Sequence, residues 1–177
     1  MMTKFEQLTE RALEYYGIFT AADARDLNIV PKYLREWVAS GRLEKVGRGV
    51  MRLTKFPYNV KCFYAEAVAL VGPGAWLFGD SVLAMLGLVA VKAPETFVAT
   101  ARRRRRELPN YIQVVLRDDE SGKDNYEGIP CQNLVDVLLD ARARFENAAL
   151  VNAIQEARKQ RLFSADENER LKEAFGV

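Results

Sequence analysis

The sequence predicts an α+β protein in two parts. Residues 1–57 are expected to form short helices and a β-hairpin, and residues 58–177 an α+β domain with a small sheet and terminal helices. Capping patterns mark the starts of helices, apolar residues recur between them at helical spacing, and short alternating stretches flank turns. With 177 residues, 49% of them hydrophobic, the chain is long enough to bury a core.

The first helices are predicted from their ends. Thr3 to Glu6 has the S/T-x-x-E form of a capping box, and apolar residues follow at helical spacing until Gly17, which predicts a helix over residues 3–16. Residues 20–23 repeat the capping pattern and predict a second, short helix. Residues 28–30 are the predicted turn. Pro31 is expected to begin a third helix, which Gly41 ends.

The third helix is expected to have one buried and one exposed face. Its predicted buried side chains are Leu34, Trp37 and Val38. Residues 42–46 and 50–53 alternate around a glycine-rich turn at 47–49, which predicts a β-hairpin. This order of helices, turn and hairpin is typical of a winged helix-turn-helix, whose third helix enters the DNA major groove and whose hairpin, the wing, contacts the backbone.

The charge distribution agrees with that interpretation. Residues 1–30 carry three basic and five acidic side chains, a net charge of −2, whereas residues 31–56 carry seven against two, a net charge of +5. A local excess of cations is what binding to DNA phosphates requires. The residues expected to contact DNA are Thr20, Lys32, Tyr33, Arg35, Glu36, Ser40, Arg42, Lys45, Arg48 and Arg52.

Several segments also resemble one family. The stretches GIFTAADA at 17–24, PKYL at 31–34 and GRLEKVGRGV at 41–50 resemble the N-terminal domain of AbiEi-type antitoxins, which belong to type IV toxin-antitoxin (abortive infection) systems of phage defence. SVLAMLGL at 81–88, and GIP at 128–130 before LVDVL at 134–138, extend the resemblance over most of the chain. The resemblance implies a transcriptional repressor that binds inverted repeats in its own operator. It also implies antagonism of a nucleotidyltransferase toxin without a stable complex.

The second part is predicted as alternating short elements. A helix over 63–71 ends at Gly72, and a helix over 80–86 precedes strands at 96–99, 112–116 and 126–129. Asn133 is expected to cap a helix over 134–145, a further helix covers 148–162, and a capping box at Ser164 opens the last one. Apolar residues of the last helices are predicted to be core, with a dimer interface as the alternative: Leu150, Ile154, Leu171 and Phe175.

A run of five arginines is the strongest local signal in this part: Arg102, Arg103, Arg104, Arg105 and Arg106. Residues 102–117 hold six arginines against Glu107, a net charge of +5. Such a block is either solvated or neutralised by an anionic partner, which leaves DNA, RNA and an acidic protein surface open. An alternative function is therefore a protein-interaction module that uses this basic patch.

A second alternative is a metal-dependent nuclease. It would bind Mg²⁺ through the acidic residues that follow the basic run, namely Asp118, Asp119, Glu120 or Glu127. Their spacing matches no nuclease motif, and residues 118–123 are better explained as a polar turn.

Other features disfavour an enzyme. The chain has no histidine, which removes the commonest general base and metal ligand. Cys62 and Cys131 are isolated, which is unlike a zinc site or a disulfide framework. We therefore expect no catalytic residue, cofactor or metal. No apolar run reaches the ~20 residues of a membrane helix, and the start lacks a signal peptide, so we expect a cytoplasmic protein. Self-association as a two-fold pair on DNA is expected by analogy with other helix-turn-helix proteins.

Overall fold

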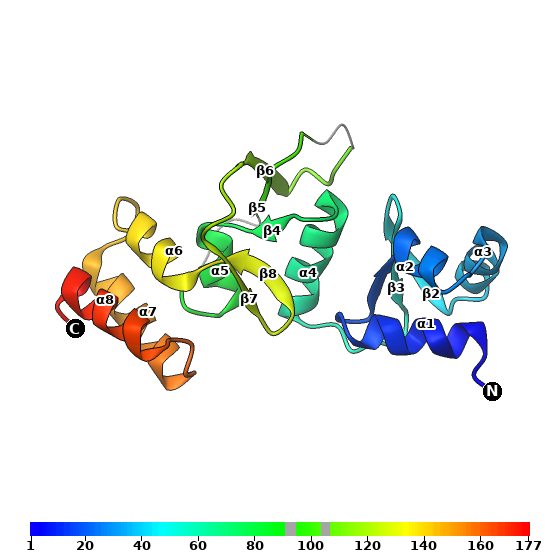
Figure 1. The fold of residues 1–177 in the computed structure, drawn as a ribbon, viewed down its shortest axis with the longest axis horizontal. Coiled ribbons are helices and arrows are strands. Elements are labelled where there is room, and N and C mark those ends of the chain that lie inside the picture. The colour runs from blue at the N-terminus through cyan, green and yellow to red at the C-terminus, as the bar shows by residue number, and fades with distance from the viewer. Residues whose placement is uncertain (91–94, 104–106) are drawn as a thin grey trace.

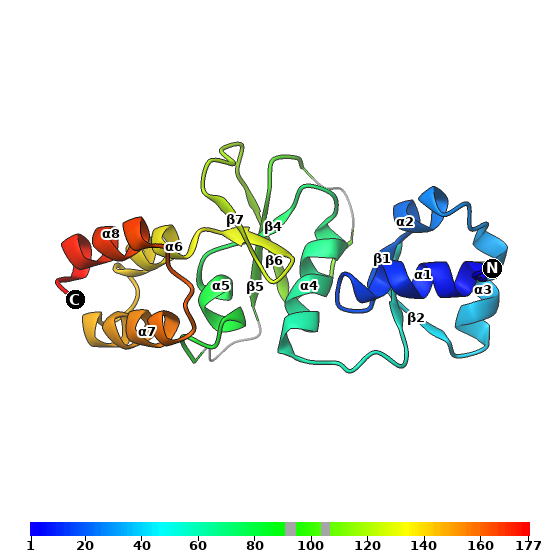
Figure 2. The same cartoon turned by 60° about the horizontal axis from the view of Figure 1, so that its bottom comes forward.

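The computed structural model describes residues 1–90, 95–103 and 107–177. Figures 1 and 2 show an elongated molecule whose parts follow one another along the long axis. The N-terminal domain is at one end, a β-sheet with helices α4 and α5 is in the middle, and helices α6 to α8 form the other end. The structure is thus a mixed helix and sheet protein, as predicted.

The N-terminal domain packs its helices against a small antiparallel sheet. Its elements are α1 (Lys4–Leu13), β1 (Ile18–Thr20), α2 (Ala21–Asp26), α3 (Pro31–Ala39), β2 (Leu43–Gly47) and β3 (Val50–Leu53). The strands pair in the order β1-β3-β2. A buried cluster joins helices and strands: Leu8, Ala12, Phe19, Ala24, Ile29, Leu34, Leu43 and Leu53.

The predicted helix starts in this domain are confirmed, and one predicted end is wrong. Thr3 and Thr20 form capping boxes, and Pro31 is the first residue of α3. Helix α1 ends at Leu13 rather than at 16. Tyr16 and Gly17 have positive φ angles of 55° and 72°, which turn the chain into β1. That strand was not predicted, because three residues are too few to display an alternating pattern.

The Thr20 cap yields a first testable prediction. The Thr20 hydroxyl accepts the Asp23 amide, and the Asp23 carboxylate in turn accepts the Thr20 amide at 2.8 Å. Thr20→Ala should lower the free energy of unfolding by about 1 kcal/mol, because it leaves a helix N–H without its acceptor. Thr20→Ser keeps the oxygen and is the control. Equal stability of the two variants in urea unfolding would contradict a role of the hydroxyl in capping.

The rest of the chain forms a second, mixed sheet with flanking helices. Its elements are α4 (Val60–Val71), β4 (Trp76–Leu77), α5 (Asp80–Met85), β5 (Thr96–Thr100), β6 (Ile112–Leu116), β7 (Lys123–Tyr126), β8 (Ile129–Gln132), α6 (Leu134–Ala141), α7 (Asn147–Lys159) and α8 (Ala165–Phe175). The strand order is β6-β5-β4-β8-β7. The pairs β5–β6 and β4–β8 are parallel, whereas β4–β5 and β7–β8 are antiparallel.

Three predicted boundaries in this part are corrected. Helix α4 begins at Val60 rather than 63, because the Asn59 side chain caps it. The strand predicted over 126–129 is instead the turn of the β7–β8 hairpin, where Glu127 and Gly128 have φ angles of 52° and 87°. Helix α6, capped by Asn133 as predicted, ends at Ala141 rather than 145.

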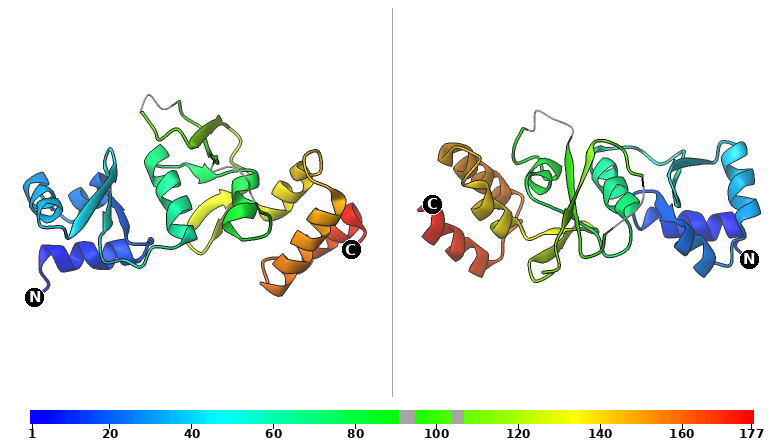
Figure 3. Two further views of the ribbon diagram at one scale, coloured as in Figure 1. Left: turned by 180° about the vertical axis from the view of Figure 1, so that it is seen from behind. Right: turned by 90° about the horizontal axis from the view of Figure 1, so that it is seen from above.

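The main hydrophobic core extends from the central sheet to both ends of the molecule. Leu150, Ile154 and Leu171 are fully buried in it, which confirms them as core, whereas Phe175 is only partly buried at its margin. Ile18 and Val50, from the N-terminal sheet, belong to the same cluster. Figures 1 and 3 show α4 between the N-terminal domain and the central sheet. The two parts are therefore packed together through α4.

Candidate nucleic-acid interface

Helix α3 exposes the polar face that the sequence predicts. Lys32, Arg35 and Glu36 are exposed, while Leu34 is buried beneath them. Lys32 and Glu36 form a loose ion pair at 3.8 Å. The prediction of the buried face is wrong for one residue, because Val38 is 37% exposed. It lies one residue before the end of α3.

Aromatic rings hold α3 against α1. The ring of Trp37 meets Phe5 edge-on with 5.0 Å between centroids, and Tyr33 stacks on Trp37 at 5.9 Å. The Arg42 guanidinium lies over the ring of Phe5, 5.0 Å from its centre. Tyr33 remains 45% exposed. The helix is thus fixed on the side that carries Trp37, while Tyr33 stays partly exposed.

The β2–β3 hairpin carries exposed cations at and near its turn. Lys45 and Arg48 are exposed, and neither has an ion pair within the described residues. The tip is fastened to α2, because the Gly49 carbonyl accepts the Ala21 amide at 2.9 Å. On the other side of the turn, Gly47 lies so close to Leu70 of α4 that a β-carbon there would overlap the Leu70 side chain. The hairpin is therefore held in place, with its cations directed outward.

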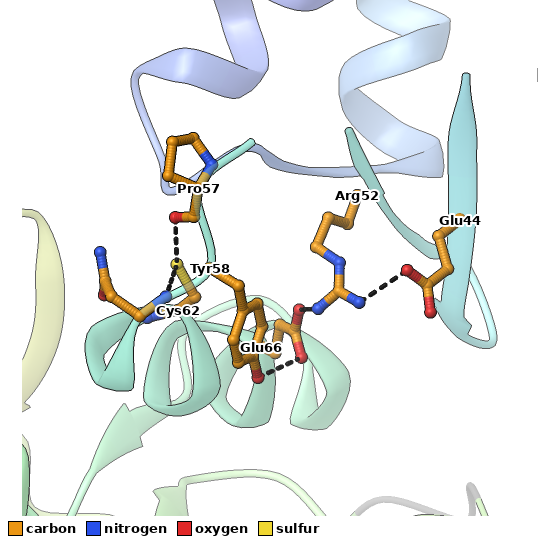
Figure 4. Close-up of polar contacts among 7 residues, drawn as sticks. Glu44, Arg52, Pro57, Tyr58, Cys62 and Glu66 are labelled. Atoms are coloured by element: carbon orange, nitrogen blue, oxygen red, sulfur yellow. Dashed lines mark hydrogen bonds and ion pairs between the residues drawn. The ribbon is translucent and has the colours of Figure 1, made fainter. Parts of the chain in front are cut away.

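Arg52 differs from the other predicted DNA contacts. Its guanidinium pairs with Glu44 at 2.6 Å and with Glu66 of α4, and it lies 4.7 Å from the centre of the Tyr58 ring (Figure 4). Only 19% of its side chain is exposed, and that of Glu66 is 7% exposed. The sequence-based assignment of Arg52 to a phosphate contact does not fit this geometry. Arg52 instead links the hairpin to α4.

The electrostatics of this link follow from its burial. Burial raises the pKa of Glu66, although Arg52 opposes the shift. Burial and the neighbouring Glu66 raise the pKa of Tyr58 to about 12, so Tyr58 stays a hydrogen-bond donor to Glu66 at 3.3 Å. Sequence reasoning missed Glu66. The sequence feature that could have indicated its role is a lone carboxylate within the apolar residues 62–71, because a buried charge needs a partner.

Tyrosines of the turn after α1 add contacts between the two parts. The Tyr16 hydroxyl donates to the Glu127 carbonyl at 2.7 Å, and that of Tyr15 reaches the Ala65 carbonyl at 3.4 Å. The Glu127 carboxylate also pairs with Lys61. These contacts fix the turn after α1 on α4 and on the turn of the β7–β8 hairpin.

Two remaining DNA candidates have roles inside the domain. The Thr20 hydroxyl is engaged in its helix cap, and the Ser40 hydroxyl donates to the Trp37 carbonyl at 3.1 Å. Of the arginine run, Arg102 and Arg103 are exposed just after β5, and Arg104, Arg105 and Arg106 lie outside the described residues. Arg102 and Arg103 thus follow a strand of the central sheet and not an element of the N-terminal domain (Figure 1).

The carboxylates of the nuclease hypothesis do not come together. Asp119 accepts the Ser121 amide at 2.9 Å, Glu120 pairs with Lys123 at 3.0 Å, and Glu127 pairs with Lys61. Within residues 1–90, 95–103 and 107–177, no group of three or more acidic or cysteine side chains is placed to hold a metal ion. Cys62 and Cys131 are separate buried thiols. Residues 118–123 therefore behave as the polar turn that their composition suggests.

The two helices α2 and α3, joined by a short turn and followed by a hairpin, place the N-terminal domain in the helix-turn-helix class. Residues 6–54 match the family model described as "Transcriptional regulator, AbiEi antitoxin". The resemblance inferred from the sequence is confirmed over these residues, and it supports a regulatory role in a toxin-antitoxin system. No curated protein matches the chain. In the described part of the chain, no helix has the length and apolar character needed to cross a membrane.

Proposed function

We propose that the protein is a DNA-binding autorepressor of a type IV toxin-antitoxin operon, with residues 1–57 as a winged helix-turn-helix domain and residues 58–177 as the antitoxin domain. Helix α3 enters the major groove of the operator, and the β2–β3 hairpin contacts the phosphate backbone. The protein acts in the cytoplasm, where its operator lies, as a two-fold pair on inverted repeats.

The observation that carries this proposal is the set of exposed cations on α3 and the hairpin. Lys32, Arg35, Lys45 and Arg48 all point into solvent from elements that are anchored on their other side. Rigid anchoring matters, because side chains that read base edges must be presented in a fixed register. The family match over residues 6–54 covers these same elements.

The role of Arg52 refines the proposed contact surface. Its two carboxylate partners occupy the guanidinium, so phosphate contact is left to Lys45, Arg48 and the exposed Arg42. Arg35, Glu36 and Tyr33 are the proposed base-reading side chains, because they lie on the outer side of α3.

The prediction for DNA binding concerns Arg35 and Arg48. The affinity of each variant is measured for the DNA upstream of the gene. Arg48→Ala should weaken binding to all sequences equally and lower the slope of log K against log salt by about 0.9, because one phosphate contact is lost. Arg35→Ala should also reduce the preference for the operator over unrelated DNA, by about tenfold, if Arg35 reads a base. The slopes are measured by fluorescence anisotropy at several salt concentrations.

A matched control is Lys172→Ala, which removes an exposed cation at the opposite end of the molecule. It should leave both slope and preference unchanged. If the Arg35→Ala and Arg48→Ala double variant keeps the wild-type affinity and slope at moderate salt, the winged-helix assignment is wrong.

The antitoxin role rests on the family match and is tested separately. We expect a nucleotidyltransferase to be encoded next to this gene, and co-expression of the chain to relieve its toxicity. Gel filtration of the two proteins together should show no stable complex. A tight complex without operator binding would favour the protein-interaction alternative.

A further inference from the structure

Strand β6 forms an edge of the central sheet. Within the described residues it pairs with β5 alone, and it ends the strand order. The Thr96 amide donates to the Tyr111 carbonyl, and the Arg117 amide donates to the Thr100 carbonyl. Backbone groups of alternate residues point to opposite sides of a strand. The N–H and C=O groups of Val114 and Leu116 therefore point away from the sheet, toward solvent.

The outer edge of β6 lacks the features that usually protect an edge strand. Such strands are commonly shielded by charges, prolines or bulges. Residues 112–116 contain none of these, their pairing with β5 is regular, and Val114 and Leu116 are 38% and 50% exposed. Figures 1 and 3 show β6 at the outside of the molecule.

The opposite edge of the same sheet provides a comparison. Strand β7 carries Lys123 and Asp124, and the Lys123 ammonium lies 4.0 Å from the centre of the Trp76 ring while pairing with Glu120. Charged side chains therefore protect β7 as they do in other proteins. The apolar surface of β6 is a local property of that strand and not of the sheet as a whole.

Cations gather at one end of β6. Because β5 and β6 are parallel and paired through Thr100 and Leu116, Arg102 and Arg103 after β5 lie at the same end of the sheet as Arg117 after β6. Arg102 and Arg103 are exposed, and neither has an ion pair within the described residues. Arg117 lies over the Phe78 ring at 5.1 Å. Asp118 and Asp119 follow Arg117 directly, and Asp119 interacts with Arg117, so among the described residues the unpaired cations at this end of the apolar edge are Arg102 and Arg103.

We propose that β6 is a docking site for an extended segment of a partner protein, which adds to the sheet as a further strand, with apolar side chains over Val114 and Leu116 and acidic side chains at Arg102 and Arg103. Main-chain hydrogen bonds to a free edge are the general basis of such strand addition. The exposed valine and leucine favour a protein over a nucleic acid, because nucleic-acid backbones offer neither strand hydrogen bonds nor apolar side chains. This surface is separate from α3 and the hairpin.

The test uses the full chain and a fluorescent peptide in which a run of glutamates precedes alternating valines and threonines. That order places the acids at the arginines when the added strand is antiparallel to β6. The controls are the same peptide with N-methylated valines, which cannot complete the ladder, and one with lysines in place of glutamates. Anisotropy should show binding of the first peptide alone.

Variants of the chain locate the site. Val114→Pro removes an N–H that points to solvent, so the sheet should persist while peptide binding weakens about tenfold. Val114→Glu tests the same edge by adding a charge while the backbone N–H is kept. Arg103→Glu should weaken binding about as much, and Lys172→Glu, on α8, should not change it. Circular dichroism verifies that each variant is folded, and operator binding of each variant is measured as a separate readout.

Three results would overturn the proposal. Equal binding of the N-methylated peptide would mean attraction by charge alone. Sedimentation showing a wild-type dimer that Val114→Glu dissociates would assign the edge to a second copy of the chain. Loss of DNA binding in Arg103→Glu, with no peptide binding by the wild type, would assign the arginines to nucleic acid. Failure of operator binding in every variant and the wild type would contradict only the proposed DNA function.

Discussion

Arg52→Met should lower the free energy of unfolding by about 3 kcal/mol at neutral pH, because it leaves the buried carboxylate of Glu66 without its cation. The side chain of Glu66 is 7% exposed, and Tyr58 can supply one hydrogen bond but no charge. Methionine keeps much of the volume of the arginine side chain, so the loss reports the charge rather than a cavity. Urea unfolding followed by circular dichroism measures it.

The loss should shrink at mildly acidic pH. The pKa of Glu66 is already raised by burial, and removing Arg52 removes the partner that holds it down. A carboxyl whose pKa is higher in the folded state stabilises the fold below its ordinary pKa and loses that contribution as the pH rises through the raised value. The variant should therefore approach the wild type as Glu66 becomes protonated.

Two further variants make this prediction specific. Adding Glu66→Gln to Arg52→Met should restore part of the lost stability, because no buried charge remains. Arg48→Met, on the same hairpin but exposed, should leave stability unchanged. A pH-independent loss in Arg52→Met would mean that packing, and not the ion pair, holds the hairpin on α4.

Gly17→Ala is expected to have a similarly large effect, about 2–4 kcal/mol, from strain and overlap together. Gly17 has a φ of 72°, and a β-carbon there would lie 2.5 Å from Cγ and 2.6 Å from Cβ of Phe56. Rotation about the side-chain bonds of Phe56 moves Cγ but not Cβ, so the backbone itself must shift. The change in the free energy of unfolding is measured in urea.

Gly41 provides a matched control. It has the same φ of 72°, and nothing lies within 4 Å of its missing β-carbon. Gly41→Ala should therefore cost only the strain of the left-handed backbone, about 1 kcal/mol. Adding Phe56→Ala to Gly17→Ala removes the overlap with Cγ but keeps that with Cβ, so the double change should cost somewhat less than the sum of the two single changes. Equal effects of the Gly17 and Gly41 variants would contradict the overlap.

Local signals predicted much of the N-terminal domain. The caps at Thr3 and Thr20, Pro31 at the first position of α3 and the glycine-centred hairpin turn each act over a few residues, so sequence alone reveals them. The exposed face of α3 followed from helical periodicity in the same way. The cap at Ser164 of the last helix was predicted on the same basis.

Features that depend on distant partners were not predictable. Strands β1 and β4 are too short to show a pattern, and they exist because β3, β5 and β8 pair with them. Charge at Arg52 suggested a phosphate contact, because the sequence gives its charge but not its partners. Val38 was placed on the buried face because periodicity does not reveal where the core beneath a helix stops.

Packing between the two parts also bears on their independence. Ile18 and Val50 belong to the N-terminal sheet, yet they are each 2% exposed because they lie in the main core around α4. A fragment cut after residue 57 would lose that cover, and Arg52 would keep one carboxylate of two. The covalent link at residues 58–59 is short, but the two parts share hydrophobic burial and should melt as one cooperative unit.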